Sequence, residues 1–285
     1  MSIKTSTDPC LLELFDDNPD HGIQDSSESA SEVGIDRLVG GLLGFSKPDR
    51  FQFLLSQMQQ GNPLLTAEDL AKIDGFKRTL SDSPWVPVKD ATPGHQAYTY
   101  FRDDSPFILT KDVCIVEASM REVSELIDCI STDEVNRVYK MLDPNFLHGE
   151  ISFRRDSVHC LEYARYRIPL CSPREFVVHS VTALLDELTH VYVCWSVKDP
   201  AYPEPSWATP LSSVIRGELL ESGILVEELP GGNTCRYTYF MHCDPKGWIP
   251  KSIYNRAAAD GVDTAKVREI FAKKRKAEGR RRRDA

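Results

Sequence analysis

The alternation of apolar and polar residues becomes regular near residue 66 and then changes period along the chain. A helical period covers residues 66–80, and Thr66 followed by Asp69 indicates an N-cap. Period-two segments typical of strands follow at residues 85–88, 96–102 and 106–116. Helical spacing then returns twice, at residues 119–129 and 132–142. This first half therefore predicts a helix, three strands and two short helices.

The second half of the chain is dominated by long segments rich in strand-forming residues. They cover residues 148–154, 158–168, 175–185, 188–197, 214–228 and 234–242. A helix is predicted from Lys251, with a break at Gly261. Because strands and helices are segregated along the chain and do not alternate, the pattern predicts an α+β fold. A curved antiparallel sheet under a long C-terminal helix would leave a cavity between them.

The first 64 residues differ from the rest. Residues 1–34 are acidic, lack apolar periodicity and are predicted to be disordered. Residues 35–64 predict a short helical extension that is interrupted at Gly44 and Pro48. That extension either binds a membrane surface or a partner, or docks on the main domain. The ten acidic and four basic residues of positions 1–60 argue against binding to an anionic membrane.

Composition narrows the class of protein. With 41% hydrophobic residues and no apolar run near 18 residues, the chain resembles a globular protein without a membrane span. Its eight cysteines include no Cys-x-x-Cys pair, which predicts reduced thiols, a cytoplasmic location and no zinc or other metal site. Residues 277–285 form a basic tail that either faces an anionic surface, stays solvated or acts as a localisation signal. No nucleic-acid partner is expected.

Motifs that carry chemistry are absent from the sequence. It contains no nucleophile elbow, phosphate-binding loop, dinucleotide fingerprint or His-Glu-x-x-His sequence. His179 and His242 fall in predicted strands, where a structural role is expected. We therefore predict a non-enzymatic protein that uses no cofactor.

Three segments together carry a resemblance to a known family. They are residues 172–177, residues 214–216, and residues 236–261 with the Lys246-Gly247 turn followed by Trp248. In this combination the chain resembles the START family of lipid-binding domains, and most closely the phosphatidylcholine-transfer branch. The resemblance covers about residues 66–275. It implies a helix-grip fold at residues 65–276, in which the C-terminal helix closes a hydrophobic tunnel that holds one lipid.

The resemblance also implies positions for the lipid head group. Two of the three aromatic positions that cage choline hold Tyr163 and Phe176, and the third holds Leu220. The aspartate position holds Asp143, whereas the arginine position holds Tyr139, with Arg137 nearby. The positions of the charged pair found in steroid-binding relatives hold Leu161 and Ser180. The cage is therefore incomplete, and a sterol ligand of that type is disfavoured.

Strand periodicity groups further residues with these positions. Leu161, Tyr163 and Arg165 share one face of their strand, and Phe176, Val178 and Ser180 share one face of the next. The resemblance implies that both faces line the tunnel. Arg165 is then a candidate partner for a lipid phosphate.

A gate is expected where the tunnel opens. It comprises the loop at residues 168–174, the proline-rich loop at residues 199–213, and the C-terminal helix, with Trp207, Trp248 and Ile253 as candidate membrane contacts. The predicted function is transfer of a single lipid, phosphatidylcholine or another phospholipid, by a monomer that visits membranes transiently. The alternatives are a lipid-sensing module that acts on a partner through residues 1–60, and an enzyme on the same scaffold.

Overall fold

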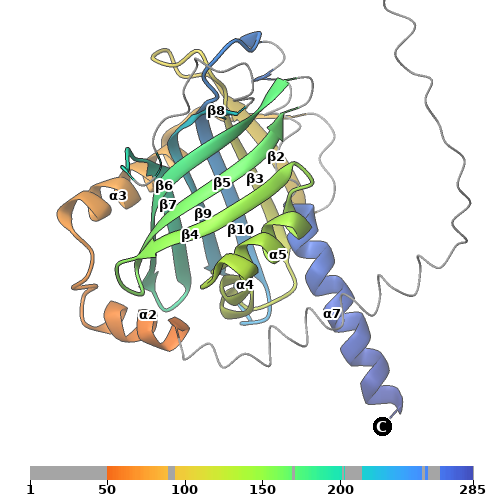
Figure 1. Ribbon diagram of the computed structural model, residues 1–285. Coiled ribbons are helices and arrows are strands. Elements are labelled where there is room, and N and C mark those ends of the chain that lie inside the picture. The colour runs from red at the N-terminus through yellow and green to blue at the C-terminus, as the bar shows by residue number, and fades with distance from the viewer. Residues whose placement is uncertain are drawn as a thin grey trace, which may run out of the picture. The chain divides into compact units, whose positions relative to one another are not determined.

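An antiparallel sheet of ten strands forms the centre of the computed structural model, which describes residues 50–88, 94–168, 171–200, 202, 214–251, 254–255 and 264–284. The strands lie in the order β1-β2-β3-β10-β9-β7-β6-β5-β4, and the short β8 pairs in parallel with β6. Their bounds are β1 (Val86–Pro87), β2 (His95–Tyr100), β3 (Leu109–Val116), β4 (Phe146–Arg154), β5 (His159–Ile168), β6 (Cys171–Asp186), β7 (Thr189–Ser196), β8 (Ile215–Arg216), β9 (Glu218–Glu228) and β10 (Cys235–Asp244). Figure 1 shows the sheet curling so that β4, β5 and β6 lie in front of β9 and β10.

The helices flank this sheet. They are α2 (Arg50–Gln59), α3 (Ala67–Asp82), α4 (Met120–Ile127), α5 (Thr132–Leu142) and α7 (Ala265–Asp284). The Thr66 hydroxyl caps α3 through the amide of Asp69, and the Asp69 carboxylate accepts from the Thr66 amide in return. The predicted α+β class is therefore confirmed, with a curved antiparallel sheet and a C-terminal helix.

Strand pairing divides the sheet into two faces. Directly paired residues point to the same side, and the pairing links Phe176, Ser180, Tyr192 and Tyr239 on one side, which we call the inner face. The opposite side, the outer face, carries Tyr163, Val177, Trp195 and Phe240, among others. Different helices cover the two faces.

Helix α3 covers the outer face. Its Phe76 ring is fully buried against Phe240, with ring centroids 5.8 Å apart. The ring lies so close to β9 that a Cβ at Gly223 would come within 2.9 Å of it and within 2.5 Å of the Tyr192 carbonyl oxygen. Burying one such ring contributes about 2–3 kcal/mol, and glycine at position 223 makes the close contact possible.

Helices α4, α5 and α7 lie on the inner side. Gly149 of β4 faces Val135 of α5, and the Asn136 side chain pairs with both backbone groups of Gly149. The Thr264 amide, just before α7, donates to Asp112 of β3. In Figure 1, α4 and α5 sit below β4 and in front of β10, within the curve of the sheet. The inner face is thus capped at one end by helices.

Helix α7 continues well beyond its contact with the sheet. Val267 and Phe271 are buried, and Lys274 forms an ion pair with Glu122 of α4 at 2.6 Å. The helix then runs to Asp284, so the basic segment predicted as a separate tail is helical to that residue. The predicted break at Gly261 lies outside the described residues.

Of the extension predicted at residues 35–64, the structure describes the part from Arg50 onward, and α2 docks on the sheet domain. Leu54 is buried, and Arg50 forms an ion pair with Asp128 and donates to the Ser157 carbonyl oxygen at 3.0 Å. The docked alternative therefore describes α2. The disordered segment predicted at residues 1–34 lies outside the described residues.

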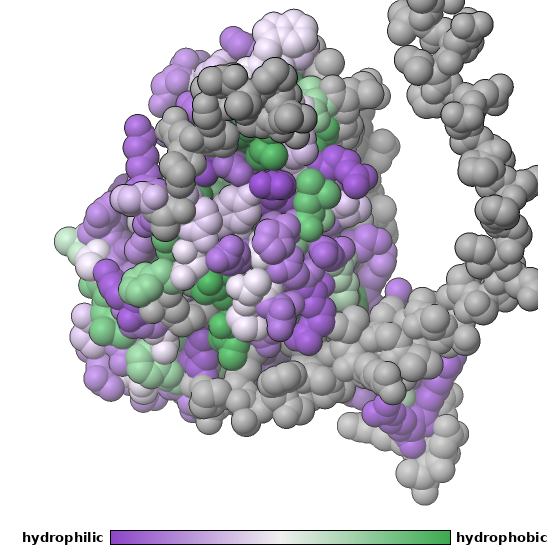
Figure 2. Space-filling model, in the orientation of Figure 1, coloured by the Kyte–Doolittle hydropathy of each residue, from purple (hydrophilic) through white to green (hydrophobic). Residues whose placement is uncertain are grey.

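The surface that Figure 2 shows is mainly hydrophilic, with small separate groups of hydrophobic residues among the coloured ones. Within the described part of the chain, no helix combines the length and apolar character that crossing a membrane requires.

We expect a buried histidine, His190, to make the stability of the fold depend on pH. His190 is 1% exposed, neither of its ring nitrogens has a hydrogen-bond partner among the described residues, and burial lowers its pKa from 6.5 to about 4. The unfolded chain takes up this proton more readily, so the free energy of unfolding falls as the pH drops from 6.5 towards 4. Between pH 7 and pH 4.5, we expect the free energy of unfolding of His190→Gln to fall by about 2–3 kcal/mol less than that of the wild type. Urea denaturation at both pH values measures the difference. A slope in His190→Gln equal to that of the wild type would contradict the prediction.

Candidate functional site

A row of aromatic rings lines one end of the inner face. Tyr139 of α5 meets Phe146 of β4 with ring centroids 5.5 Å apart, and Phe146 meets Tyr166 of β5 at 5.5 Å. Tyr166 in turn meets Phe176 of β6 at 6.1 Å. All three contacts are edge-on, the arrangement that aromatic pairs prefer. Four rings from one helix and three strands therefore form a continuous wall.

The Phe176 ring occupies its place because of a glycine. Gly217 lies between β8 and β9, where a Cβ would come within 2.5 Å of the Phe176 ring. The ring therefore packs against bare backbone, and the strand predicted at residues 214–228 is divided at this point.

Four tyrosines of the inner face combine two properties. Burial raises the pKa of each hydroxyl group above its usual range, by a large margin for Tyr139, Tyr166, Tyr192 and Tyr239. Their side chains nevertheless keep a partly accessible surface. These four residues are therefore surrounded by protein without being fully shielded from solvent, which distinguishes them from the tightly packed residues of the outer face.

A carboxylate lies among these tyrosines. Glu162 of β5 accepts hydrogen bonds from the Ser180 hydroxyl and, at 3.3 Å, from the Tyr192 hydroxyl. Its charge also helps to raise the pKa of the Tyr139 and Tyr166 hydroxyls, after burial itself. A carboxylate on an inner face needs such partners, because an unpaired buried charge is costly. Glu162 and Ser180 thus place a hydrogen-bonded carboxylate on the inner face of the sheet.

Asp143 adds a second carboxylate near the aromatic row. It follows the last residue of α5, and the Asn145 amide donates to it at 2.7 Å. Burial raises the pKa of its carboxyl group, and its charge contributes to the raised pKa of the Tyr166 and Tyr239 hydroxyls. Asp143, predicted for the head group, therefore lies near the same tyrosines as Glu162.

The structure separates the two predicted cage residues. Tyr163 pairs with Val177, so it lies on the outer face, whereas Phe176 pairs with Ala164 and lies on the inner face. A register shift between Tyr166 and Ile168 is the cause. Next to the turn, Ile168 pairs with Cys171, and that register would have set Tyr163 opposite Phe176. A one-residue bulge moves every later side chain to the other face.

Leu161 and Arg165 share this outer position, so the prediction that both strand faces line one tunnel is wrong. Tyr163 donates to Glu175 at 2.8 Å and stacks on Tyr202 at 5.3 Å between ring centroids. Arg165 and Arg216 surround the same Glu175 carboxylate, at 3.6 and 2.8 Å. Tyr163 and Arg165 therefore belong to an ion-pair cluster on the outer face.

The remaining predicted residues are distributed over several places. Val178 and Ser180 share the inner face with Phe176. Leu220 lies at a bulge of β9 and lines a pocket of about 230 Å³ next to α3. Trp248 is 88% exposed, which suits a surface contact. Trp207 and Ile253 lie outside the described residues.

Sequence reasoning missed Glu162, Tyr166, Tyr192 and Tyr239 as site residues. The signal that could have found them is the even-numbered face of residues 158–168, which carries Glu162 and Tyr166. Choosing the even-numbered face over the odd-numbered one required knowledge of the bulge between Tyr166 and Ile168.

Comparison with known proteins shows which protein family this chain matches. A family model of the START domain matches residues 77–268, more than half of the chain. Human StAR-related lipid transfer protein 5 has a TM-score of 0.60 and 20% identity, covering 71% of this chain and 93% of that one. Human STARD10 has a TM-score of 0.60 and 17% identity, covering 76% and 83%. A StAR-related lipid transfer protein fragment from Xanthomonas axonopodis has a TM-score of 0.52 and 17% identity, covering 66% and 98%. No curated protein sequence matches the chain.

Proposed function

The chain belongs to the START domain family, and from this premise we propose that it binds one lipid against the inner face of its sheet and carries it between membranes. The observation that carries the proposal is the set of inner-face tyrosines that are surrounded by protein yet accessible. In a fully packed core these side chains would have no accessible surface. An elongated apolar ligand with a polar end suits a space lined by rings, aliphatic side chains and a few polar groups.

The polar groups favour a zwitterionic phospholipid. Glu162 and Asp143 attract a cationic head group, and the faces of Tyr166 and Phe176 attract a quaternary ammonium. Arg137 of α5 has two buried guanidinium nitrogens without a hydrogen-bond partner among the described residues, although Glu134 lies 3.8 Å away. A guanidinium with unused donors is suited to a phosphate. We therefore favour a choline-containing or similar phospholipid.

Transfer requires little net affinity. Two acyl chains with about 30 methylenes gain roughly 0.8 kcal/mol per group on leaving water. That gain is nearly the same in a bilayer and in an apolar cavity, so loading and unloading are close to balanced. The protein supplies the cavity, the partners for the head group and a gate. The proposed gate includes Trp248, whose exposed indole suits the membrane interface.

Lipid capture tests the proposal. The full chain is incubated with vesicles of mixed phospholipids, re-isolated and analysed by native mass spectrometry. We expect one phospholipid per chain, enriched in the choline class. Movement of a labelled lipid between vesicles then distinguishes a carrier from a sensor, which would bind lipid without accelerating transfer. Failure to capture any lipid would overturn the proposal.

The basic end of α7 is expected to assist at anionic membranes. Residues 273–285 carry eight basic and two acidic residues, and each Lys or Arg near an anionic surface contributes up to about 1 kcal/mol. Deleting residues 277–285 should slow transfer from anionic donor vesicles several-fold, but hardly from neutral ones. Added salt should reduce the difference, because salt screens surface charges. Equal rates for both proteins on anionic vesicles would show that the segment has no membrane role.

A further inference from the structure

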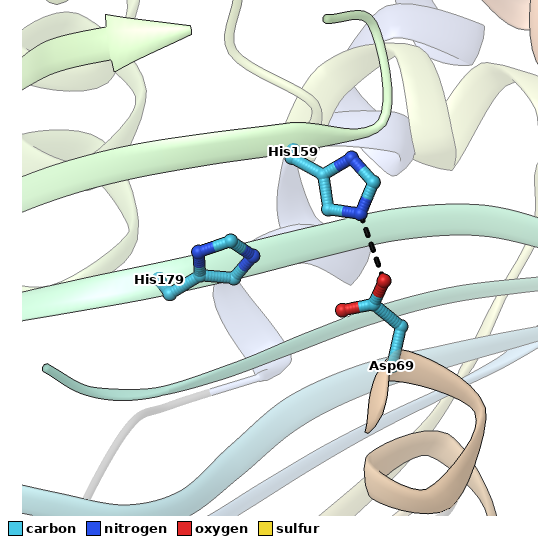
Figure 3. Close-up of side chains that lie close together, drawn as sticks. All are labelled: Asp69, His159 and His179. Carbon is cyan, nitrogen blue, oxygen red and sulfur yellow. Dashed lines mark hydrogen bonds and ion pairs between the residues drawn. The ribbon is translucent and has the colours of Figure 1, made fainter. Parts of the chain in front are cut away.

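Three side chains with metal-binding donor atoms meet on the outer face, away from the proposed lipid site. They are Asp69 of α3, His159 of β5 and His179 of β6, and their donor atoms all lie within 4.8 Å of one another (Figure 3). Asp69 and His159 are only 4% and 1% exposed. We propose that Asp69, His159 and His179 form a binding site for a divalent transition-metal ion of the zinc class.

The donor set suits such an ion. Two imidazole nitrogens and one carboxylate oxygen are ligands that Zn²⁺ accepts, and a water molecule can complete a tetrahedron. Around Zn²⁺, with ligand distances near 2.1 Å, tetrahedral donor atoms lie about 3.4 Å apart. The longest separation in the cluster is at most 4.8 Å, so a shift of about 1–2 Å by one side chain closes it. Figure 3 shows His159 and Asp69 already joined, with the His179 ring beside them.

His159 has a carboxylate beside its second ring nitrogen, as metal-binding histidines commonly do. Its Nδ1 lies 2.9 Å from the carboxylate oxygens of Asp156, and its Nε2 lies 2.9 Å from Asp69 Oδ2. A carboxylate on one ring nitrogen fixes the orientation of the ring and makes the other nitrogen a better donor. Asp156 is itself held in place, because it accepts from the backbone amides of Val158 and His159.

His179 supplies an unused donor atom. Its Nε2 is buried and has no hydrogen-bond partner among the described residues. The ring is held between His159 and Trp195, with centroid distances of 5.6 and 5.0 Å. Nothing in the lipid-binding function uses this nitrogen.

Two neighbours must respond when the ion binds. The Nη2 atom of Arg155 lies 2.6 and 2.8 Å from the two ring nitrogens of His159. Its side chain is half exposed, so it can turn towards solvent and keep its ion pair with Asp156. Asp69 keeps its bonds from Thr66, because a carboxylate has enough lone pairs for the cap and an ion. The ion takes the place of the direct contact between His159 Nε2 and Asp69 Oδ2.

A metal ion at this site would hold α3 against the sheet. Asp69 lies in the first turn of the helix that covers the outer face, whereas both histidines belong to the sheet. A bound ion would tie the helix to β5 and β6 and stabilise the folded state by mass action. The site is independent of the lipid cavity, so either proposal can fail without the other.

The test uses the full chain treated with a chelator and then titrated with Zn²⁺ and, separately, with Co²⁺. Competition with a chromophoric chelator measures Zn²⁺ affinity, and the visible spectrum of Co²⁺ reports its ligands. We expect one ion per chain, a higher melting temperature with Zn²⁺, and a four-coordinate Co²⁺ spectrum without a thiolate charge-transfer band. His179→Gln and Asp69→Asn should each lower Zn²⁺ affinity at least tenfold.

The matched control is His148→Gln, which removes an exposed histidine outside the cluster and should bind Zn²⁺ like the wild type. Circular dichroism confirms that each variant is folded. His179→Gln with wild-type affinity, a thiolate band with Co²⁺, or no stoichiometric binding at all would overturn the proposal. In those cases Asp69, His159 and Asp156 form a structural ion-pair network only.

Discussion

Replacing Phe176 with alanine is expected to weaken lipid binding by roughly tenfold or more, because the ring completes the aromatic wall of the inner face. Truncation of a well-placed aromatic contact typically costs 1–3 kcal/mol, and 1.4 kcal/mol is a factor of ten in affinity. The ring centroids of Phe176 and Tyr166 lie 6.1 Å apart, and the Phe176 ring packs over Gly217. The affinity of the purified folded protein for a fluorescent phospholipid measures the effect.

Tyr163→Ala is the matched control for Phe176→Ala. Both variants lose one aromatic ring from adjacent strands, but Tyr163 lies on the outer face against Glu175 and Tyr202. We expect Tyr163→Ala to lower the free energy of unfolding while lipid affinity stays unchanged. Because Phe176→Ala can also destabilise the fold by up to about 3–5 kcal/mol, both quantities are measured for each variant. Lipid affinity that falls in Tyr163→Ala but not in Phe176→Ala would mean that the inner and outer faces have been assigned the wrong way round.

Arg174→Lys is expected to lower the free energy of unfolding by about 3 kcal/mol. The Arg174 guanidinium is 1% exposed and donates to the carbonyl oxygens of Pro245, Lys246 and Ser172. A lysine cannot reproduce this planar fork, and each buried carbonyl left without a partner costs about 1–3 kcal/mol. Urea denaturation at neutral pH measures the loss.

Arg236→Lys provides the comparison for this variant. Arg236 is exposed and pairs with Glu227 at 3.2 Å, and exposed ion pairs contribute at most about 1 kcal/mol. Since Arg174 fastens the start of β6 to the turn that precedes Trp248, its replacement should also speed lipid loss. Equal stability of the two lysine variants would refute the structural role of Arg174.

Much of the fold could be predicted from local patterns. Helical spacing located α3, α4 and α5, and in the structure each helix begins where the side chain of Thr66, Ser119 or Ser131 bonds to the backbone of the turn that follows. The order of strands and helices predicts the α+β class, since a mainly parallel sheet needs a crossover connection, usually a helix, between its strands. The sequence predicts Asp143, Phe176, Val178 and Ser180 as lipid contacts. The structure puts the last three on the inner face, and their role in binding stays a prediction.

Which side of β5 lies on the inner face of the sheet depended on tertiary structure. Period-two alternation shows which residues of a strand share a side, but not which side becomes the inner face. That choice depends on a single bulge near Arg167, which pairs Tyr163 with Val177 and turns Glu162 and Tyr166 inward. The same holds for the cluster of Asp69, His159 and His179, whose members are far apart in sequence and meet only when α3 docks on β5 and β6. Local residue preferences determine the elements of this protein, whereas register and docking, which depend on long-range contacts, determine its sites.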